Sequence, residues 1–393
     1  MVEIFSYDEV YKAYRECSKN KRHTPNAALF EIDENKKVYT LYEILNSDKY
    51  EIGKSITFLD EFPNYREIFA ADFIDRIVQH LVINRLNPYF EKEFIPNSFS
   101  CRKGKGTLYG IKTLEKEAKK LSCNYTKIIY VLKCDCQHYF YSFDKRILFD
   151  KILKLIDKYN IFEPDVKDHY IKLIKQIVFN CPQNNCIRKG TEEDWIKNIA
   201  PSKTLFNCDE FHGLPIGNIS SQVFSNVYMN DFDHWIYDEL GFTCYGRYCD
   251  DFYILSESKE KLLEAIPKMR EYLSKINIIL HPKKMYLQEF SKGVTFIGSV
   301  VKPNRTYITN RTIGRCYELM IKTYHYAQEH ELTNEDIQYF VTSMNSYLGF
   351  FQHHATYNIR KKIAKCKWIK PFKGKYFNFT PDYTKIKLYA KYK

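Results

Sequence analysis

Hydrophobic and polar positions change in blocks along the first half of the chain. Residues 68–86 carry apolar side chains at spacings of three and four, which is typical of a packed helix, and Asn87-Pro88 is expected to end it. Residues 127–134 form a short apolar run that predicts a buried strand, with Asp135 at its end. Apolar residues between 147 and 155 predict that another helix begins soon after this strand.

The pattern continues through the second half. Residues 221–240 place aromatic and aliphatic side chains on one helical stripe, and residues 246–256 read as two short strands joined in a hairpin. A helix is expected over residues 262–273, followed by a strand over residues 293–301. The resulting order of strand, helix, helix, hairpin, helix and strand predicts an α+β fold.

Charge and aromatic content point to a polyanionic partner. The 393 residues contain 60 Lys and Arg against 48 Asp and Glu, a formal net charge of +12, together with 33 Tyr and 28 Phe. Lys and Arg side chains can bind the phosphates of a polyanion, and aromatic rings interleaved with them can stack on bases. Many of the rings are nevertheless expected to fill the protein core. This composition favours nucleic acid as the partner.

Cysteine usage and the N-terminus indicate a reducing compartment. The 12 Cys show no secreted disulfide framework, the first residues resemble no signal peptide, and no run of 18 apolar residues occurs. We therefore expect reduced thiols, a cytoplasmic location and no membrane attachment. Cys181, Cys186, Cys208 and His212 are spaced like no common zinc finger, so the usual zinc signature is missing.

Two adjacent aspartates, Asp250 and Asp251, lie inside the predicted hairpin. A solvated turn is the ordinary explanation, because Asp is frequent in turns, but neighbouring carboxylates repel unless a cation lies between them. If Asp135 converges on them, three aspartates could hold two Mg²⁺, about 3.5 to 4 Å apart, in the arrangement used for in-line phosphoryl transfer.

A second cluster is the loop "SFSCRKGKGTLYG", residues 98–110. Its three cations and three glycines suit a close approach to phosphate, but the order of a Walker loop is absent. A solvated basic loop is the other interpretation.

Six motifs resemble those of reverse transcriptases and follow the order of that family. "YCDD" resembles the Tyr-x-Asp-Asp box and "KCDCQHYFYSFD" the first palm motif; "GLPIGNISSQVFSNVYMNDFD" is similar to the next motif. "HPKKMYLQEFSKGVTFIG" resembles the lysine-bearing and primer-grip segments, and "PNYREIFAADFIDRIVQHL" and "NSFSCRKGKGT" resemble the fingers motifs. The resemblance implies a right-hand polymerase with fingers, a palm of antiparallel sheet backed by helices, and a short helical thumb.

The implied division of the chain has three parts. Residues 1–124 would form the N-terminal segment and fingers, residues 125–304 the palm with an interleaved fingers insertion, and residues 305–393 the helical thumb and a basic C-terminal tail.

One motif resembles a particular lineage. Residues 216–222, "IGNISSQ", stand where retroviral and group II intron enzymes usually show Q-G-x-x-x-S-P, and this form is similar to reverse transcriptases of diversity-generating retroelements. That resemblance implies cDNA synthesis from a template repeat RNA, errors opposite adenines, mutagenic retrohoming and a small basic oligomeric accessory protein.

The resemblance also implies roles for individual residues. Asp135, Asp250, Asp251 and the main-chain carbonyl of Cys136 would bind two Mg²⁺, with Mn²⁺ able to substitute, and Lys283 or Lys284 would be the general acid. The expected dNTP-binding residues are Arg102, Lys103, Phe140 as a steric gate, Ile216, Gly217 and Gln222. The expected primer and template contacts are Tyr248, Cys249, Gly298, Arg360 and Lys361.

Two other functions fit the same sequence. The chain could be a reverse transcriptase of another bacterial lineage, such as a retron, group II intron-like or antiviral enzyme. It could also be a catalytically silent RNA-binding protein on the same fold, although clustered carboxylates do not help a protein to bind RNA.

Overall fold

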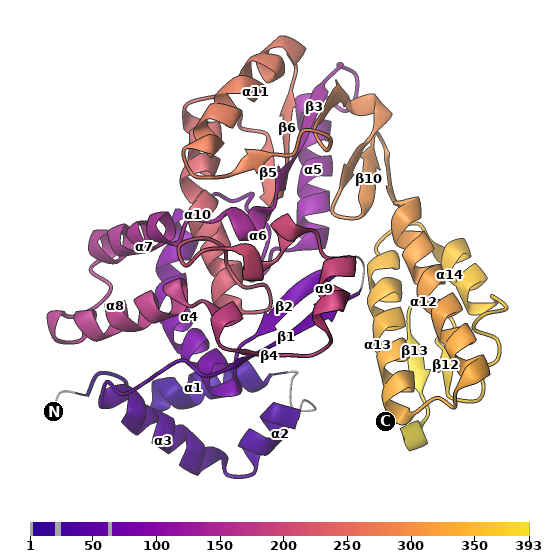
Figure 1. The fold of residues 1–393 in the computed structure, drawn as a ribbon. Coiled ribbons are helices and arrows are strands. Elements are labelled where there is room, and N and C mark those ends of the chain that lie inside the picture. The colour runs from indigo at the N-terminus through magenta and orange to yellow at the C-terminus, as the bar shows by residue number, and fades with distance from the viewer. Residues whose placement is uncertain (1–2, 20–24, 62–64, 393) are drawn as a thin grey trace. The chain divides into compact units, whose positions relative to one another are not determined.

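A computed structural model describes residues 3–19, 25–61 and 65–392. Two compact units divide the chain: the first contains Met1–Gly106, Leu132–Ile254 and Lys259–Tyr286, and the second contains Thr107–Val131, Leu255–Ser258 and Leu287–Lys393. Figure 1 follows the chain through both. These units cut the chain differently from the predicted fingers, palm and thumb, which stay a prediction about functional parts. Pro63 and Asn64, which open a fingers motif, lie outside the described residues.

Four helices form the N-terminal part of the first unit. They are α1 (Tyr7–Ser18), α2 (Pro25–Glu31), α3 (Glu34–Asn46) and α4 (Phe73–Glu93). Helix α1 begins with a capping box between Ser6 and Glu9, and it packs along α4. The predicted end of α4 is wrong, because the helix continues through Pro88. Phe90 and Phe94 beyond the proline are buried, and this burial offsets the backbone hydrogen bond that proline cannot donate.

A small sheet has the order β2-β1-β4, and its strands β1 and β2 lie between α3 and α4 in the chain. Strand β1 (Ser55–Asp60) pairs antiparallel with β2 (Arg66–Ala70) and parallel with β4 (Cys186–Arg188). Between β4 and α10 the chain forms short pieces, namely α9 (Glu192–Asn198), η2 (Pro201–Lys203) and η3 (Leu205–Asn207), while η1 (Pro182–Asn184) precedes β4.

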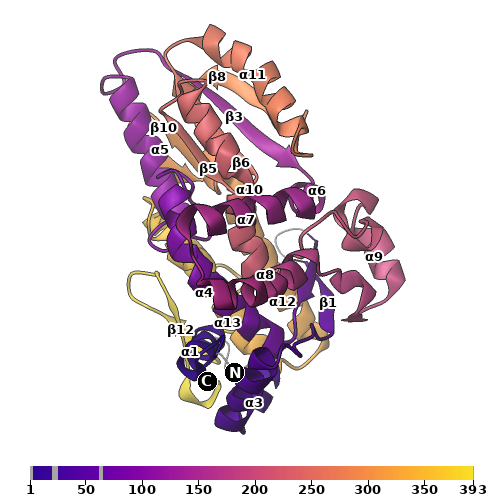
Figure 2. The same ribbon diagram turned by 90° about the vertical axis from the view of Figure 1, so that its left-hand side faces the viewer.

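The larger sheet has the order β5-β6-β3-β7, with β8 also pairing with β3. Its strands are β3 (Tyr130–Gln137), β5 (Tyr245–Tyr248), β6 (Asp251–Ser256), β7 (Ile279–Leu280) and β8 (Tyr286–Glu289). Helices α10 (Ile219–Asp238) and α11 (Lys259–Ser274) pack on the sheet, where the Phe232 ring lies 5.7 Å from that of Phe252 and 5.6 Å from that of Tyr272 (Figures 1 and 2). The short helix α6 (Tyr139–Ser142), α7 (Lys145–Tyr159) and α8 (Pro164–Phe179) complete this part. The predicted α+β class is confirmed.

The second unit begins with α5 (Thr107–Leu121), which packs on β10. After η4 (Phe290–Lys292), β9 (Val294–Phe296), β10 (Ser299–Lys302) and β11 (Arg305–Ile308) form an antiparallel sheet. The single strand predicted over residues 293–301 is therefore wrong. Ile297 and Gly298, at φ 46° and 81°, turn the chain back, as a two-residue hairpin with two positive φ angles does.

The C-terminal part of the second unit contains helices α12 (Asn310–Glu329), α13 (Asn334–Phe351) and α14 (Tyr357–Ala364). The predicted basic tail is an ordered hairpin of β12 (Phe377–Phe379) and β13 (Ile386–Leu388), followed by η5 (Ala390–Tyr392). Asn345 of α13 holds β13, since its amide nitrogen donates to Ile386 O at 3.0 Å and its oxygen accepts from Ile386 N at 2.6 Å. Among the described residues, no helix is both long and apolar enough to cross a bilayer.

Candidate active site

Asp135 lies near the end of β3, where the buried apolar run of the strand meets solvent. The residues before it, Val131 and Leu132, are fully buried, whereas Asp135 is half-buried. Its main-chain oxygen accepts from His281 N at 2.8 Å, and its carboxylate Oδ1 lies 3.0 Å from Lys284 Nζ. The core therefore fixes the backbone of Asp135 and leaves the carboxylate at the edge.

Asp250 comes from the turn between β5 and β6. Tyr248 pairs with Asp251, so that Cys249 and Asp250 form the two-residue turn, with Cys249 at φ 55°. Asp250 O accepts from Cys136 N at 2.9 Å, which brings the turn against β3. Burial first, and then the charge of Asp135, raise the pKa of Asp250. The structure thus brings Asp135 and Asp250 together.

Asp251 faces a lysine that the sequence analysis missed. Lys133, two residues before Asp135 on β3, forms an ion pair with the Asp251 carboxylate. The Lys133 side chain is only 7% exposed, and burial lowers its pKa to about 8. A lysine inside an otherwise apolar strand run was the available signal, because a buried ammonium needs a partner.

The donor set fits a hard divalent cation. Carboxylates are the ligands that Mg²⁺ prefers, and a cation between Asp135 and Asp250 would relieve the repulsion that raises the pKa of Asp250. Within the described ranges no three His, Cys, Asp or Glu side chains gather as a complete metal site, so the expected three-aspartate set is not fully assembled. Lys284 and Lys133 neutralise Asp135 and Asp251 instead. The main-chain carbonyl of Cys136 as a ligand stays a prediction.

The two candidate general acids, Lys283 and Lys284, have different contacts in the structure. The Lys284 ammonium reaches the Asp135 carboxylate, whereas Lys283 bonds through its main-chain nitrogen to His281 Nδ1, at 3.2 Å. Both side chains are exposed. This placement favours Lys284.

Phe140 lies on a segment that hydrogen bonds hold against another part of the same chain. Residues 140–145 run beside residues 211–214, with Leu214 N donating to Phe140 O at 2.7 Å and Gly213 N donating to Phe143 O at 2.9 Å. Tyr139 is buried while Phe140 is half-buried. Of the two adjacent rings, Phe140 is therefore the one that can meet a substrate.

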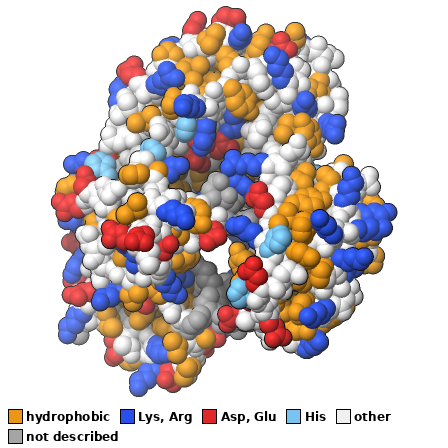
Figure 3. All heavy atoms as spheres, turned by 45° about the vertical axis from the view of Figure 1, so that its right-hand side comes forward, with side chains coloured by type: hydrophobic (Ala, Val, Ile, Leu, Met, Phe, Trp, Pro, Cys, Tyr) orange, Lys and Arg blue, Asp and Glu red, His pale blue; other side chains and the backbone are white. Residues whose placement is uncertain are grey.

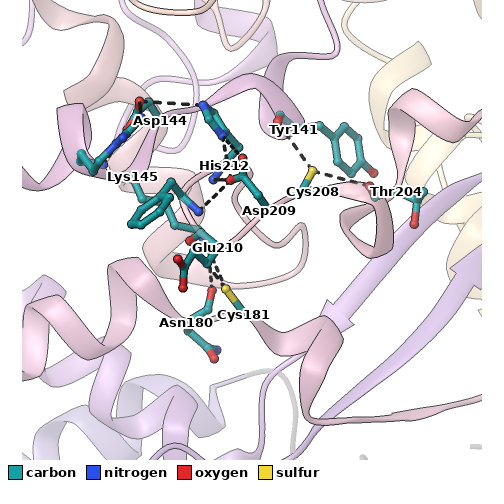
Figure 4. A network of polar contacts seen from close by, with 12 residues as sticks. Tyr141, Asp144, Lys145, Asn180, Cys181, Thr204, Cys208, Asp209, Glu210 and His212 are labelled. Carbon is teal, nitrogen blue, oxygen red and sulfur yellow. Dashed lines mark hydrogen bonds and ion pairs between the residues drawn. The ribbon is translucent and has the colours of Figure 1, made fainter.

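Polar contacts beyond this segment reinforce it (Figure 4). The buried Lys145 ammonium bonds to Asn180 O at 3.0 Å, Glu210 O at 3.2 Å and Cys181 Sγ at 3.3 Å. His212 Nδ1 lies 2.8 Å from Asp209 Oδ1, and Cys208 Sγ donates to the main-chain oxygens of Tyr141 and Thr204. Cys181, Cys208 and His212 of the loosely spaced set thus each contact the segment of Phe140, whereas Cys186 Sγ donates to Gln183 O.

The residues around Ile216 pack on β2. Ile216 O accepts from Phe69 N at 2.8 Å, and Ile216 itself is half-buried. Gly217 has φ 120°, and a Cβ there would lie 2.9 Å from Ile68 Cγ2. This contact already requires glycine, independently of any base pair. Gln222 is exposed in the first turn of α10.

The predicted triphosphate contact by Arg102 does not agree with its placement. The guanidinium forms three hydrogen bonds to the Glu91 carboxylate, the shortest at 2.8 Å, and its Nη1 donates to Ile95 O and Ser98 O. With 6% of its side chain exposed, Arg102 ties the loop to α4. Lys103 is exposed. The charge and glycine content of this loop do not indicate that one of its cations, Arg102, forms an ion pair within the protein.

A similar correction applies to Arg360 in the second unit. Its Nη1 donates to Asp382 O at 2.6 Å and the residue is 8% exposed, so it anchors the β12–β13 turn rather than presenting its charge. Lys361 is half-buried, with Nζ 5.9 Å from the Tyr357 ring centroid. Gly298 lies in the β9–β10 turn, where its O accepts from Thr309 N.

The sequence analysis also missed the support beneath the Tyr-x-Asp-Asp turn. Arg247 Nη2 lies 2.6 Å from Asp233 Oδ2, and both residues are fully buried. Tyr245 OH donates to the same carboxylate at 2.6 Å. This pair fixes β5, and with it Tyr248 and Cys249, on α10.

Comparison with known proteins agrees with this geometry. Residues 60–301 match the family described as reverse transcriptase (RNA-dependent DNA polymerase). The chain belongs to the reverse transcriptase family. The family fold explains why the two carboxylate-bearing segments, far apart in sequence, lie on adjacent strands. No curated protein matches the chain.

Solved structures that are similar to this chain include telomerases from Candida species. The truncated apo telomerase from Candida tropicalis has 13% identity and a TM-score of 0.48, covering 66% of this chain and 55% of that one. Candida albicans telomerase in complex with a fragment of telomeric RNA has 9% identity and a TM-score of 0.48, covering 80% and 55%. The chain thus spans a little more than half the length of these proteins, and the family assignment rests on the sequence match.

Proposed function

We propose that this reverse transcriptase is an active RNA-directed DNA polymerase. The observation that carries the proposal is the juxtaposition of Asp135 and Asp250 at the edge of the β3–β6 pair, with Lys284 beside them. A protein that only binds RNA gains nothing from clustered carboxylates.

The residues of the site would have different roles in nucleotide transfer. Asp135 and Asp250 would hold the two Mg²⁺, with Asp251 completing the set once it leaves Lys133. Bound Mg²⁺ would activate the primer 3′-hydroxyl and stabilise the charge of the leaving pyrophosphate. Lys284 would donate a proton to the pyrophosphate, and Phe140 would exclude a ribose 2′-hydroxyl.

The experiment is primer extension on an RNA template with Mg²⁺, comparing the wild-type chain with Asp250→Asn. We expect extension to be abolished while binding of an RNA–DNA duplex, followed by fluorescence anisotropy, is retained. Asp165→Asn, which changes an exposed carboxylate of α8, is the matched control and should keep wild-type extension. Wild-type rates in Asp250→Asn would refute the assignment.

We further infer that the enzyme belongs to the lineage of diversity-generating retroelements. The form of residues 216–222, with Ile216 and Gln222, supports this placement. The enzyme would copy a template repeat RNA in the cytoplasm, with misincorporation opposite adenines, and act with a small basic accessory protein. Sequenced cDNA from one defined template tests it, because an error spectrum without excess at adenines would favour another bacterial lineage.

A further inference from the structure

Two cysteines meet next to Asp250. The segment 97–101 runs beside β5, with Ser98 in an isolated parallel bridge to Arg247. Phe99 N donates to Arg247 O at 2.8 Å, and Arg247 N donates to Asn97 O at 2.9 Å. The loop that carries Cys101 is therefore fixed to the strand that ends in the Tyr-x-Asp-Asp turn.

The pairing continues to the cysteines themselves. Cys249 N donates to Ser100 Oγ at 3.3 Å, and Ser100 O accepts from the Asn226 side chain at 2.8 Å. Cys101 and Cys249 then have φ angles of 54° and 55°, so both chains turn at the cysteine. Cys101 directly follows Ser100, so the bond from Cys249 N to Ser100 Oγ places the two cysteines next to each other.

We propose that Cys101 and Cys249 form an oxidation site whose disulfide switches off polymerisation. The switching effect rests on the proposed polymerase function; the disulfide itself does not. Reversible disulfides in reducing compartments are typically transient and regulatory, and sensor cysteines are exposed and stand next to a resolving cysteine. Cys101 is exposed and Cys249 is half-buried, which gives an attacking and a resolving thiol.

The chemistry balances with a low-molecular-weight disulfide, such as oxidised glutathione, as oxidant. The Cys101 thiolate attacks one sulfur and releases one small thiol; the Cys249 thiolate then attacks the Cys101 sulfur and releases the second. Two protein thiols are oxidised to one disulfide, and one small disulfide is reduced to two thiols.

The consequence for the active site follows from geometry. A disulfide holds its sulfur atoms about 2.05 Å apart, closer than two sulfur atoms that are not bonded to each other. Closing this gap must pull the turn at Cys249, and Asp250 is the next residue, with its main-chain oxygen bonded to Cys136 N. Oxidation is therefore expected to displace a carboxylate that polymerisation needs.

Peptide mapping tests the site directly. The full-length protein is incubated with oxidised or reduced glutathione, its free thiols are blocked, and it is digested with trypsin. Cys101 falls in peptide 93–102 and Cys249 in peptide 248–259, each with one cysteine. We expect these two peptides to be cross-linked after oxidation of the wild type and of Cys123→Ser, a control at another exposed cysteine, but not of Cys101→Ser.

Primer extension on the same samples tests the switch. Oxidation should cause a loss of extension that a thiol reductant reverses in the wild type and in Cys123→Ser, whereas Cys101→Ser should keep its extension under both conditions. Two free, labelled thiols after oxidation would overturn the site, and a cross-linked protein with undiminished extension would overturn the switch. Absence of extension in the reduced wild type would instead contradict the proposed polymerase function, while the peptide result still decides the cysteine pair.

Discussion

Like charges at the end of β3 and in the turn before β6 are balanced by two lysines. Asp135 and Asp250 lie beside each other, and burial raises the cost of charging Asp250. Lys284 contacts Asp135, and Lys133 contacts Asp251. Because buried charges need partners, these ammonium groups explain how the carboxylates can stay close in the folded chain before substrate arrives.

A substitution of Phe140 tests whether the shape of this side chain determines the selectivity between deoxyribose and ribose. Phe140→Ala should admit ribonucleotides, lowering discrimination between dNTP and rNTP by roughly tenfold or more, the scale on which shape alone discriminates. Single-nucleotide incorporation with dNTP and rNTP measures the ratio. Phe140→Tyr keeps a ring of similar size and should retain selectivity, whereas an unchanged ratio in Phe140→Ala would make Phe140 a packing residue.

A substitution of Ile216 tests how an apolar side chain at this position affects the fidelity of DNA synthesis. An isoleucine offers only shape, whereas a glutamine amide can hydrogen-bond near the incoming nucleotide, and hydrogen-bonding sites reject misfits better than apolar ones, where differences reach only about 1 to 3 kcal/mol. Ile216 is half-buried, so a glutamine can be accommodated. Ile216→Gln should lower misincorporation, most visibly opposite template adenine.

Sequenced cDNA made by both proteins on one template gives the error ratio for Ile216. Ile216→Leu is the matched control, since it changes shape without adding a polar group, and it should keep the wild-type spectrum. Reduced activity of Ile216→Gln at an identical error ratio would show that the residue only packs on β2.

At the scale of elements, one buried carboxylate joins the chain between β4 and α10 to β2. Glu67 accepts hydrogen bonds from Trp195 Nε1 at 2.8 Å, Thr204 Oγ1 at 2.6 Å and Leu205 N at 2.8 Å. Burial raises the pKa of Glu67 despite these three donors. The short pieces α9 and η3 thus depend on polar contacts to a single side chain.

Glu67→Gln should therefore destabilise the chain by about 1 to 3 kcal/mol, because the amide nitrogen leaves one buried donor without an acceptor. Urea unfolding followed by tryptophan fluorescence measures this, with the exposed Glu43→Gln as a control that should stay near wild type. The folded-state pKa of Glu67 is raised, so the cost of its buried charge is present above that pKa and is relieved as the pH falls through it. The difference between wild type and Glu67→Gln should accordingly widen as the pH is lowered; a constant difference would contradict the raised pKa.

Periodicity and motif order predicted the elements that carry the carboxylates, but not how side chains between elements are used. The run before Asp135 predicts β3 because its apolar residues fill the core. The continuation of α4 through Pro88 depends on the distant packing of Phe90 and Phe94, which local propensity does not encode. Arg102 and Arg360 have the same local signals as exposed cations, and only the folded chain shows that Glu91 and Asp382 bind them.

At the scale of the whole molecule, positive charge lies on both compact units, while the paired carboxylates lie in the first. Between residues 357 and 392 the sequence contains eleven Lys and Arg and a single acidic residue, Asp382. Figure 3 shows Lys and Arg side chains among hydrophobic ones over the exposed face of the C-terminal helices and hairpin. Such a surface suits binding to a phosphate backbone without sequence preference.

The salt dependence of duplex binding separates the cations that meet phosphate from those used within the fold. Each phosphate contact adds close to one unit to the slope of log affinity against log salt concentration. Lys361→Gln should weaken binding of an RNA–DNA duplex and reduce the slope by about one, without changing thermal stability.

Arg360→Gln should instead lower thermal stability, because the Asp382 carbonyl loses its donor, and leave the slope of the remaining folded protein close to wild type. Anisotropy titrations at several salt concentrations, with melting curves of both variants, give the two quantities. A reduced slope in Arg360→Gln with unchanged melting would assign the phosphate contact to Arg360 and refute the anchoring role that its 8% exposure indicates.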